Sequence, residues 1–497
     1  MKPVHRRTFL GNMGIAALAG YAPKQLFALQ TTFSSEGSVK FPAGFFWGAS
    51  TAAAQVEGSP SVDGGGESVW DVFLRTPHAT KDGSTNVVAD DEYHLWAEDL
   101  KLIRQLGFNA YRFSASWARI MPDGRGRINS KGLDYYDRLV DALLAAKITP
   151  FLTTYHFDYP EALQKQGGWL HADSAQWLAD YAHVLSARLS DRVFHWLTIN
   201  EPNIFWGFGS EIGMMPPNQR LPDTDLVRGA HNILLGHGKS VQAIRAAAKQ
   251  KVEVSLAFAG LLSLPANESP GDVAAAKAAS FAVRKVQIIP GFAPMGMLSA
   301  AWWLDPIYLG RYPEDGLKLY PDAERLAKTE DMKTISQPLD YCGVNLYFAP
   351  HVKAGANGEA EVVPEGPDIP RSHYGWALTP DVLYWGPKFL SERYRKPIVI
   401  TENGWSSEDA PAADGKVHDA QRVAFLNSYL KSLLRASQES IAVSGYLHWS
   451  LLDNFEWAEG FGQRFGLIYV DYKTQQRIVK DSAIRYKEII ASNGATL

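Results

Sequence analysis

Short apolar runs alternate with longer helical segments along most of this chain, and this alternation limits the fold more than any other feature. The runs are rich in β-branched and aromatic residues, which is typical of buried strands. Strands that alternate with helices predict a parallel sheet with a helix in each crossover. Eight strands are expected, at 45–50, 109–114, 148–156, 193–200, 252–259, 340–347, 397–403 and 444–452.

The clearest helical patterns cover 91–107, 132–147, 174–190 and 420–437. The first has an acidic start at Asp90 and Asp91 and a glycine stop at Gly107. Eight strand–helix units can close on themselves, so we expect a single (β/α)₈ TIM barrel with long βα loops over residues 41–497. A doubly wound open sheet is the alternative, but it would more often carry a glycine-rich phosphate turn after the first strand, and none is evident.

Composition excludes several classes of protein. The chain has 497 residues, 46% of them hydrophobic and 21% charged, which is globular rather than disordered or multi-span membrane composition. Its net charge is -4 and it has no long basic run, so nucleic acid is not an expected partner. The one cysteine, Cys342, forms no disulfide within the chain and is expected to be a small buried hydrophobe. His231 and His237 lack the i, i+4 spacing of a helical metal pair, so no metal site is expected there.

The first residues are expected to form a targeting signal rather than part of the fold. Arg6 and Arg7 precede Phe9, Leu10 and an apolar stretch shorter than the ~20 residues of a membrane span. This arrangement resembles a twin-arginine export signal, with a frayed basic terminus as the alternative. We therefore expect a signal peptide over 1–30, a linker over 31–40, and export to the periplasm or the extracellular space, with no other membrane contact. The cleavage site, after Ala19 or near Ala28, stays open.

Polar side chains stand at the end of nearly every expected strand. The carboxyl ends of barrel strands converge on one face, where active sites of this architecture lie. One polar strand end would be unremarkable, but seven at equivalent positions predict a site. The residues concerned are Gln55, Arg112, His156, Asn200, Glu201, Asn345, Tyr347, Glu402, Asn403 and Trp449.

Two glutamates at these ends indicate the reaction class. Glu201 and Glu402 are 402 − 201 = 201 residues apart, yet the barrel would bring both to one face. Paired carboxylates are the usual apparatus of glycoside hydrolysis, with one carboxyl protonated and the other ionised. Arg112 would keep a neighbouring carboxylate ionised, and Tyr347 could donate a hydrogen bond to it. Either glutamate alone could be an ion-paired strand end, but the two together favour catalysis.

Several longer motifs carry a family resemblance. "TINEP" and "VITENG", around Glu201 and Glu402, resemble the acid/base and nucleophile motifs of glycoside hydrolase family one, the β-glucosidase family. "FFWGASTAAAQVEGS", "YRFSASWARI", "TTYHFDYPEAL", "LDPIYLGRYP" and "LHWSLLDNFEWAEGFGQRFGLIYVDY" are similar to its other landmarks, in the family's order. The similarity extends from about Phe41 to about Arg485, and the family's fold is the (β/α)₈ barrel.

The resemblance implies roles for the matching residues. Glu201 would be the general acid and then the general base, and Glu402 the nucleophile of a retaining mechanism, which requires carboxyl groups about 5–5.5 Å apart. Asn200 would hold the sugar 2-hydroxyl. The other implied substrate-binding residues are Gln55, His156, Trp449 and Glu456 at the remaining hydroxyls, Trp449 and Trp457 as aromatic walls, and Phe465 closing the pocket, while Arg112, Asn345 and Tyr347 would tune Glu402.

The chain also departs from the family's usual residues. Ala54 and Phe157 stand near the predicted sugar pocket where the family often has larger or different rings, and Leu346 replaces the first Tyr of a common Asn-Tyr-Tyr. Glu456 and Trp457 argue against phosphorylated sugars, because a phosphate needs cationic partners in this loop.

The expected function is that of a retaining β-glycosidase acting on terminal β-D-glycosyl residues, with β-glucosides first and β-galactosides or β-fucosides as further candidates. A small-molecule β-glycoside is the expected partner, and the chemistry requires no metal or organic cofactor. A transglycosidase of the same fold and a glycoside-binding protein without activity are the alternatives. The aglycone preference, which depends on loops such as 354–373, the oligomeric state and the pH optimum stay open.

Overall fold

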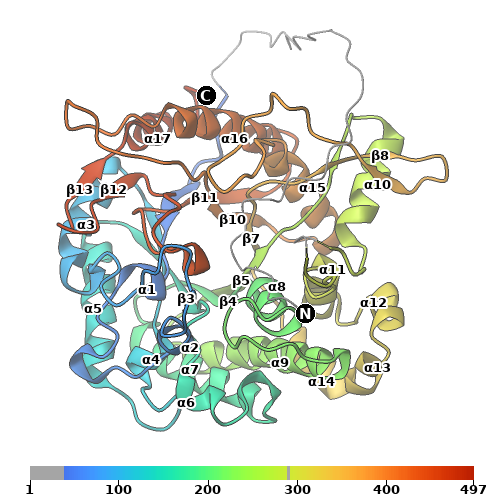
Figure 1. Ribbon diagram of the computed structural model, residues 1–497, viewed down its shortest axis with the longest axis horizontal. Coiled ribbons are helices and arrows are strands. Elements are labelled where there is room, and N and C mark those ends of the chain that lie inside the picture. Colours follow the sequence, from blue (N-terminus) through green and yellow to red (C-terminus); the bar gives the residue numbers. More distant parts are fainter. Residues whose placement is uncertain (1–38, 288–290) are drawn as a thin grey trace.

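The computed structural model describes residues 39–287 and 291–497, and its centre is a closed barrel of parallel strands (Figure 1). The strands follow one another around the barrel in the order β1-β11-β10-β7-β5-β4-β3-β2. The predicted TIM barrel is thus confirmed, and the open sheet is wrong. The barrel strands are β1 (Phe46–Ser50), β2 (Ala110–Ser114), β3 (Thr149–Tyr155), β4 (His195–Asn200), β5 (Glu253–Ala259), β7 (Cys342–Asn345), β10 (Ile398–Asn403) and β11 (Val443–Trp449).

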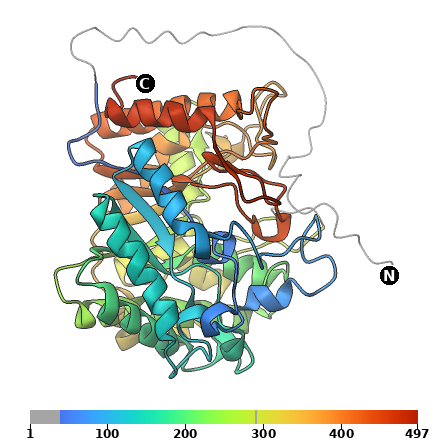
Figure 2. The ribbon, with the colours of Figure 1, turned by 90° about the vertical axis from the view of Figure 1, so that its left-hand side faces the viewer.

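Long helices surround the barrel. Figure 1 shows α3 and α5 on one side, α7 and α9 along the bottom and α16 and α17 along the top, and Figure 2 shows the first pair turned toward the viewer. Each covers the outer face of the strands with its apolar side, as the (β/α)₈ fold requires. These helices are α3 (Glu92–Leu106), α5 (Ser130–Ala145), α7 (Ser174–Leu189), α9 (Asp223–Ala247), α15 (Val382–Tyr394), α16 (Ala420–Gln438) and α17 (Asp481–Ala491).

Of the two end signals predicted for α3, the glycine stop is confirmed and the acidic cap is not. Gly107 follows α3 with φ 77°, and its N–H donates to the carbonyl of Arg104, as a glycine stop does. Asp91 precedes the helix but its side chain forms no capping hydrogen bond with the first turn. It contacts His94 instead, at 2.6 Å from Oδ1 to Nδ1.

The connections after the strands hold the shorter elements. The other α-helices of the described residues are α1 (Ala53–Val56), α2 (Val69–Phe73), α4 (Trp117–Ile120), α6 (Glu161–Gln164), α8 (Pro202–Trp206), α10 (Pro270–Phe281), α11 (Ala300–Leu309), α12 (Glu314–Leu319), α13 (Asp322–Leu326) and α14 (Thr329–Ile335). A three-stranded sheet joins β6 (Leu264–Pro265), β8 (His351–Ala354) and β9 (Ala360–Val362), and a two-stranded one joins β12 (Ile468–Val470) and β13 (Arg477–Val479).

Apolar side chains fill both sides of the barrel wall. One cluster fills the barrel interior and contains Ala110, Phe151, Leu197, Ala257, Tyr341, Val399 and Leu447. A larger cluster lies between the strands and the surrounding helices, and Cys342 belongs to it, fully buried as predicted. The interior is therefore a packed core, so a ligand can enter only at the barrel's ends.

In each of the two histidines of α9, one ring nitrogen forms a hydrogen bond with a side-chain hydroxyl of the protein. His231 Nδ1 lies 3.0 Å from the Tyr312 hydroxyl, and His237 Nδ1 lies 2.7 Å from Thr198 Oγ1. Within residues 39–287 and 291–497, no group of three or more His, Cys, Asp or Glu side chains is placed to hold a metal ion.

Among the helices that the structure describes, none combines the length and apolarity that a membrane crossing needs. The predicted export signal and most of the linker lie outside the described residues. The division into signal, linker and catalytic domain therefore stays a prediction.

Candidate active site

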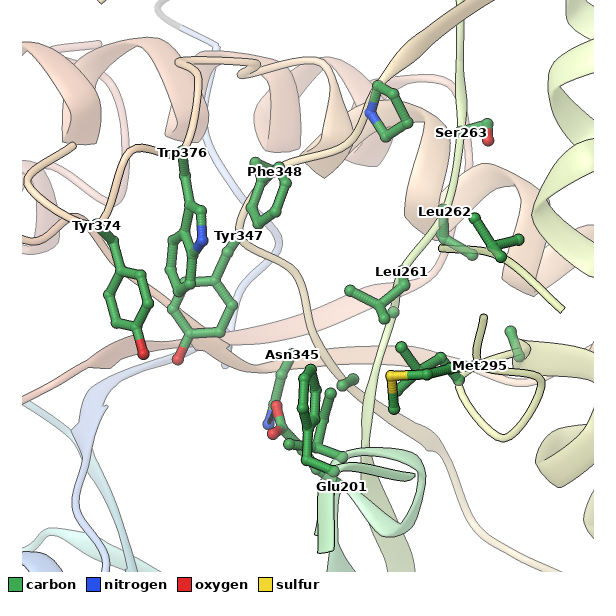
Figure 3. A pocket seen from close by; sticks show the side chains of 18 of the residues that line it. Glu201, Leu261, Leu262, Ser263, Met295, Asn345, Tyr347, Phe348, Tyr374 and Trp376 are labelled. Atoms are coloured by element: carbon green, nitrogen blue, oxygen red, sulfur yellow. Dashed lines mark hydrogen bonds between the residues drawn. The ribbon is translucent and has the colours of Figure 1, made fainter. Parts of the chain in front are cut away.

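A cavity of about 850 Å³ opens among the connections that follow the carboxyl ends of the strands (Figure 3). Ten of the twelve side chains predicted for the site line it. They come from segments that are far apart in the sequence and that only the closed barrel brings together. These ten are Gln55, His156, Glu201, Asn345, Tyr347, Glu402, Trp449, Glu456, Trp457 and Phe465.

Glu201 stands where β4 gives way to α8. Its φ of 45° is unusual for a residue with a side chain, and Pro202 begins the helix directly after it. The Glu201 N–H donates to the carbonyl of Ala257 on β5 at 2.7 Å, which anchors this turn to the neighbouring strand. A conformation of this kind costs roughly 1–3 kcal/mol and persists where the surroundings enforce it, often at functional sites. The turn places the carboxyl at the cavity rather than in the barrel wall.

Glu402 is held by two donors. Arg112, fully buried on β2, donates from Nη1 to Glu402 Oε1 at 2.5 Å, and the Tyr347 hydroxyl donates to Oε2 at 2.8 Å. Gly404, two residues later, passes so close to β11 that a Cβ would lie 1.8 Å from the Trp449 carbonyl oxygen. Only glycine permits this approach, so the "ENG" motif fixes both the carboxyl and the path of the chain behind it.

Two amides connect the carboxyls beneath the cavity floor. Asn345 donates from Nδ2 to Glu201 Oε1 at 2.7 Å and to Asn200 Oδ1 at 3.2 Å. The Thr401 hydroxyl donates to Asn345 Oδ1 at 2.6 Å, which fixes the orientation of this amide. Arg112 Nη2 donates to Asn200 Oδ1 at 2.7 Å. Arg112 and Asn345 are therefore shared supports of both carboxyls.

The two carboxyls differ in their surroundings, and this separates their proton affinities. Burial, followed by the nearby charge of Glu402, raises the pKa of Glu201 to about 8 against the opposing effects of Asn345 and Arg112. Burial also raises the pKa of Glu402, but Arg112 and Tyr347 contact this carboxylate directly and oppose the rise. Of the two, Glu201 is the one that keeps a proton at neutral pH, whereas the contacts of Glu402 with Arg112 and Tyr347 favour its ionised form.

The inner end of the cavity presents polar atoms that the described residues leave unpaired. Gln55 donates from Nε2 to the Phe455 carbonyl at 2.8 Å and to Glu456 Oε2 at 3.2 Å, while its Oε1 is buried without a partner. His156 Nε2 accepts from Asn200 Nδ2 at 2.9 Å, and its Nδ1 is likewise unpartnered. Burial lowers the pKa of His156 well below its ordinary value, so the neutral ring has Nδ1–H free to donate. A ligand with several hydroxyls would satisfy these atoms.

Aromatic rings form the walls of this inner end. His156 stacks on Trp449 and Trp457, with ring centroids 5.9 and 6.0 Å apart. Trp457 also packs against Phe157, at 4.9 Å. Phe465 lies 6.2 Å from Tyr347 and closes the opposite side.

Some predicted positions differ from expectation. Arg112 and Asn200 do not line the cavity but lie just beneath it, 0% and 1% exposed. Asn345, expected beside Glu402, makes its direct hydrogen bond to Glu201, although it also lowers the pKa of Glu402. Of the two departures placed near the sugar pocket, Phe157 lines the cavity and Ala54 does not.

The loop 354–373, expected at the aglycone side, does line the outer part of the cavity, but sequence reasoning missed the other side chains there. Figure 3 shows Tyr374, Trp376 and Phe348 on one side of it and Leu261 and Met295 on the other. The available signal was the aromatic pair in "HYGW", which follows the loop 354–373 directly. Leu261 and Met295 have no comparable signal, because they sit in loops with no regular pattern.

Relatives of known activity align with almost the whole chain. Beta-glucosidase A of Thermotoga maritima is 41% identical over 457 residues, which are 92% of this chain and 98% of that protein. The 1,4-beta-D-glucan glucohydrolase of Thermotoga neapolitana is 41% identical over 459 residues, covering 92% and 99%. The bifunctional beta-D-glucosidase/beta-D-fucosidase of Bifidobacterium breve is 37% identical over 490 residues, covering 92% and 99%.

Solved structures agree with these alignments. The beta-glucosidase from Thermotoga maritima in complex with glucoimidazole superposes with a TM-score of 0.82 at 40% identity, over 92% of this chain and 99% of that one. The family model of Glycosyl hydrolase family 1 matches residues 38–495. With the barrel, the paired glutamates and a match over nearly its full length, the chain belongs to glycosyl hydrolase family 1 and is a glycoside hydrolase.

Proposed function

We propose that this protein is a retaining β-glycosidase that removes terminal β-D-glucosyl residues from small β-glucosides. The observation that carries the proposal is the pair of buried carboxyls, Glu201 raised in pKa and Glu402 bonded to Arg112. One carboxyl is thereby suited to donate a proton and the other to attack, which is the division of labour that glycoside hydrolysis needs.

In the first half-reaction Glu402 attacks the anomeric carbon while Glu201 protonates the departing glycosidic oxygen. The bond between that oxygen and the anomeric carbon breaks, and a covalent glycosyl-enzyme forms on Glu402. Bond formation removes the negative charge of Glu402, which was the second cause of the raised pKa of Glu201. The acid that has just lost its proton is thus better able to stay ionised.

In the second half-reaction Glu201 acts as a base. It takes a proton from a water molecule that attacks the anomeric carbon from the opposite face, and Glu402 leaves as a carboxylate. The Asn345 amide favours this stage, because its hydrogen bond to Glu201 Oε1 stabilises the ionised form. Two displacements at one carbon retain the β configuration.

The sugar is held at the inner end of the cavity. Gln55, His156 and Glu456 offer a mixture of acceptors and donors to the hydroxyls, and Trp449 and Trp457 provide rings for the C–H faces. Asn200 reaches the 2-hydroxyl through the Nδ2 hydrogen that does not bond His156. Glu456 supplies a carboxyl where a phosphorylated sugar would require lysine or arginine, so the substrate is an unphosphorylated sugar.

β-Glucosides are the primary substrates, and β-fucosides are the secondary ones. Support comes from the relatives named beta-glucosidase and from the one named beta-D-glucosidase/beta-D-fucosidase. β-Galactosides are further candidates, and a structure of the Thermotoga maritima enzyme in complex with galacto-hydroximolactam supports them.

The test uses an aryl β-glucoside with the wild type, Glu402→Gly and, as a matched control, the exposed Glu330→Gly. The wild type and the control should turn over, and Glu402→Gly should not. A 2-fluoro β-glucoside should add one sugar to the intact mass of the wild type and none to that of Glu402→Gly. Equal turnover by Glu402→Gly, or no turnover by the wild type, refutes the proposal.

We also propose that the protein is exported through the twin-arginine route. Arg6 and Arg7 followed by Phe9 and Leu10 support this, and so does the lack of any need for disulfides in a chain with one cysteine. Replacing both arginines with lysine should leave the full-length protein in the cytoplasmic fraction. Unchanged export of that double variant would contradict the proposal.

A further inference from the structure

The outer part of the cavity is lined mostly by apolar side chains. Among the described residues, eleven large apolar side chains are exposed, and three of these, Leu261 (37%), Val286 (40%) and Val362 (48%), line this one cavity. Buried neighbours continue the same surface inward, namely Phe208, Met215, Leu262, Met295 and Leu298. Exposed apolar side chains that gather in one place mark a binding surface rather than ordinary surface variation.

This apolar surface begins beside the proton donor. Figure 3 shows Glu201 at one end of the space that separates Leu261 and Met295 from Phe348 and Trp376. The group that departs with the glycosidic oxygen must lie on this side, because Glu201 protonates that oxygen. The cavity is also in the upper part of the roughly 300–1,000 Å³ range of pockets for drug-sized ligands, so it holds more than one sugar ring.

Several polar groups of the outer part are already engaged with the protein, although the Trp376 Nε1–H is buried without a partner and can serve one hydroxyl of a ligand, and Arg284 also lines the cavity. Ser280 donates to the Ala276 carbonyl at 2.8 Å, and Arg371 donates to Glu365 at 2.9 Å. A second sugar placed here would lose hydrogen bonds from its hydroxyls to water without equivalent replacement, which is unfavourable.

The indole of Trp376 has no free face for sugar stacking. Trp376 stands between Tyr374 and Phe348, with centroid distances of 4.4 and 5.1 Å and interplanar angles of 18° and 22° (Figure 3). Both faces of the indole are thus covered by rings. Phe348 and Trp376 line the cavity with apolar ring atoms, which suits an apolar group.

We infer that the leaving-group side of this site selects apolar aglycones, alkyl or carbocyclic, over a second sugar. The inference rests on the proposed β-glucosidase function and adds the chemical class of the aglycone to it. The residues that carry the selection are Leu261, Met295, Phe348 and Val362.

The test is a series of β-glucosides with primary alcohols as leaving groups, from ethyl to butyl to hexyl, together with cellobiose. The acidity of these alcohols hardly changes with chain length, so a trend in kcat/KM reports contact with the aglycone. A fully buried methylene is worth about fourfold and a half-buried one about twofold, which predicts roughly a tenfold rise or more from ethyl to hexyl. Hexyl glucoside should also exceed cellobiose. A flat series, or cellobiose equal to or above hexyl glucoside, overturns the inference.

Two variants locate the effect. Leu261→Ser combined with Val362→Ser should reduce the hexyl-to-ethyl ratio of kcat/KM about threefold or more. Leu309→Ser is the matched control, because Leu309 is equally exposed, at 39%, but does not line the cavity. An unchanged ratio in the double variant would overturn the assignment to these residues.

A binding measurement separates this inference from the proposed function. Ethyl and hexyl 1-thio-β-glucosides resist hydrolysis, and calorimetry gives their dissociation constants whether or not the enzyme turns over. Tighter binding of the hexyl compound by roughly tenfold supports the inference even if no glucoside is hydrolysed. Turnover of an aryl glucoside with equal binding of both thioglucosides would refute the inference and leave the proposed function standing.

Discussion

Replacing Glu402 with glutamine should lower the pKa of Glu201, and the size of the change tests the electrostatic account of this site. Burial and, next, the charge of Glu402 together raise the pKa of Glu201 to about 8. Glutamine keeps the shape of the side chain and removes its charge, while an NH₂ group replaces one of the two oxygens that accept from Arg112 and Tyr347. It also leaves the charge of Arg112 without its carboxylate partner, so Arg112 should stabilise ionised Glu201 more strongly.

The magnitude follows from the separation that a retaining mechanism requires. Two charges about 5–5.5 Å apart at an effective dielectric constant of ~20 interact by about 3 kcal/mol, which is about two pKa units. The pKa of Glu201 should therefore fall from about 8 to roughly 6 in Glu402→Gln. Burial remains in the variant, so the pKa should stay above that of an exposed glutamate.

The assay is a carbon-13 NMR titration of protein labelled at the glutamate carboxyl carbons. Glu201→Gln identifies the resonance by its disappearance, and the exposed Glu330→Gln serves as a control for general effects of charge removal. A pKa that stays at about 8 in Glu402→Gln would mean that burial alone sets the proton affinity. The argument that the two carboxyls regulate each other would then be wrong.

Three further outcomes are expected. Glu201→Ala should lower kcat/KM for alkyl glucosides by about 10²–10⁴-fold and have a much smaller effect on dinitrophenyl glucoside, whose leaving group needs no acid; equal losses on both would contradict the acid role. Burial raises the pKa of Glu456 well above its ordinary value and favours the neutral carboxyl. Glu456→Ala should lower kcat/KM for glucosides by roughly 2–15-fold, chiefly through KM, because a hydrogen bond between neutral groups is worth about 0.5–1.5 kcal/mol; an unchanged KM would exclude this contact. Lys480 is fully buried and donates to Asp409 and Asp453 at 2.6 Å each. Lys480→Met leaves these carboxylates without their cation, so it should reduce the free energy of unfolding by about 3–5 kcal/mol in denaturant titrations. The exposed Lys487→Met is the control and should not change it.

The pH profile of the wild type follows from the same two carboxyls. Activity requires protonated Glu201 and ionised Glu402. As pH rises through about 8, Glu201 loses its proton and kcat/KM should fall. As pH falls through the pKa of Glu402, the nucleophile becomes protonated and kcat/KM should fall again. Initial rates at low substrate concentration across the pH range measure both limbs, and full activity well above pH 8 would contradict the assignment of Glu201 as the acid.

The barrel was predictable because its strands carry a strong local pattern. The runs around Trp196 and Ile400 are continuous and apolar, and the structure places strand ends within three residues of those expected. The sheet of β6, β8 and β9 was not predicted, since strands of two to four residues carry too little pattern to stand out. The positive φ of Glu201 could not be predicted either, because Pro202 restricts the preceding residue without specifying the left-handed conformation.

The site was predictable where short motifs contain its residues. Glu201, Glu402 and Glu456 each lie in such a motif, and all three reach the cavity. Contacts between strands were harder to predict, because the position of a side chain at a strand end does not reveal which neighbouring residue it contacts. Asn345, expected beside Glu402, donates its hydrogen bond to Glu201. The outer wall depends on where irregular loops return to the barrel, and only long-range packing determines that.

The order of the strands has a consequence for when activity can first arise. The proton donor precedes the nucleophile by 201 residues, and the loop with Glu456 comes later still. A chain released from the ribosome before β10 is made would contain the proton donor Glu201 but not the nucleophile Glu402. Even with β10 present, β1 has no partner on one side until β11 closes the ring between them. Hydrolytic competence therefore begins with the completion of the ring, near the end of synthesis, rather than growing in proportion to the length of folded chain.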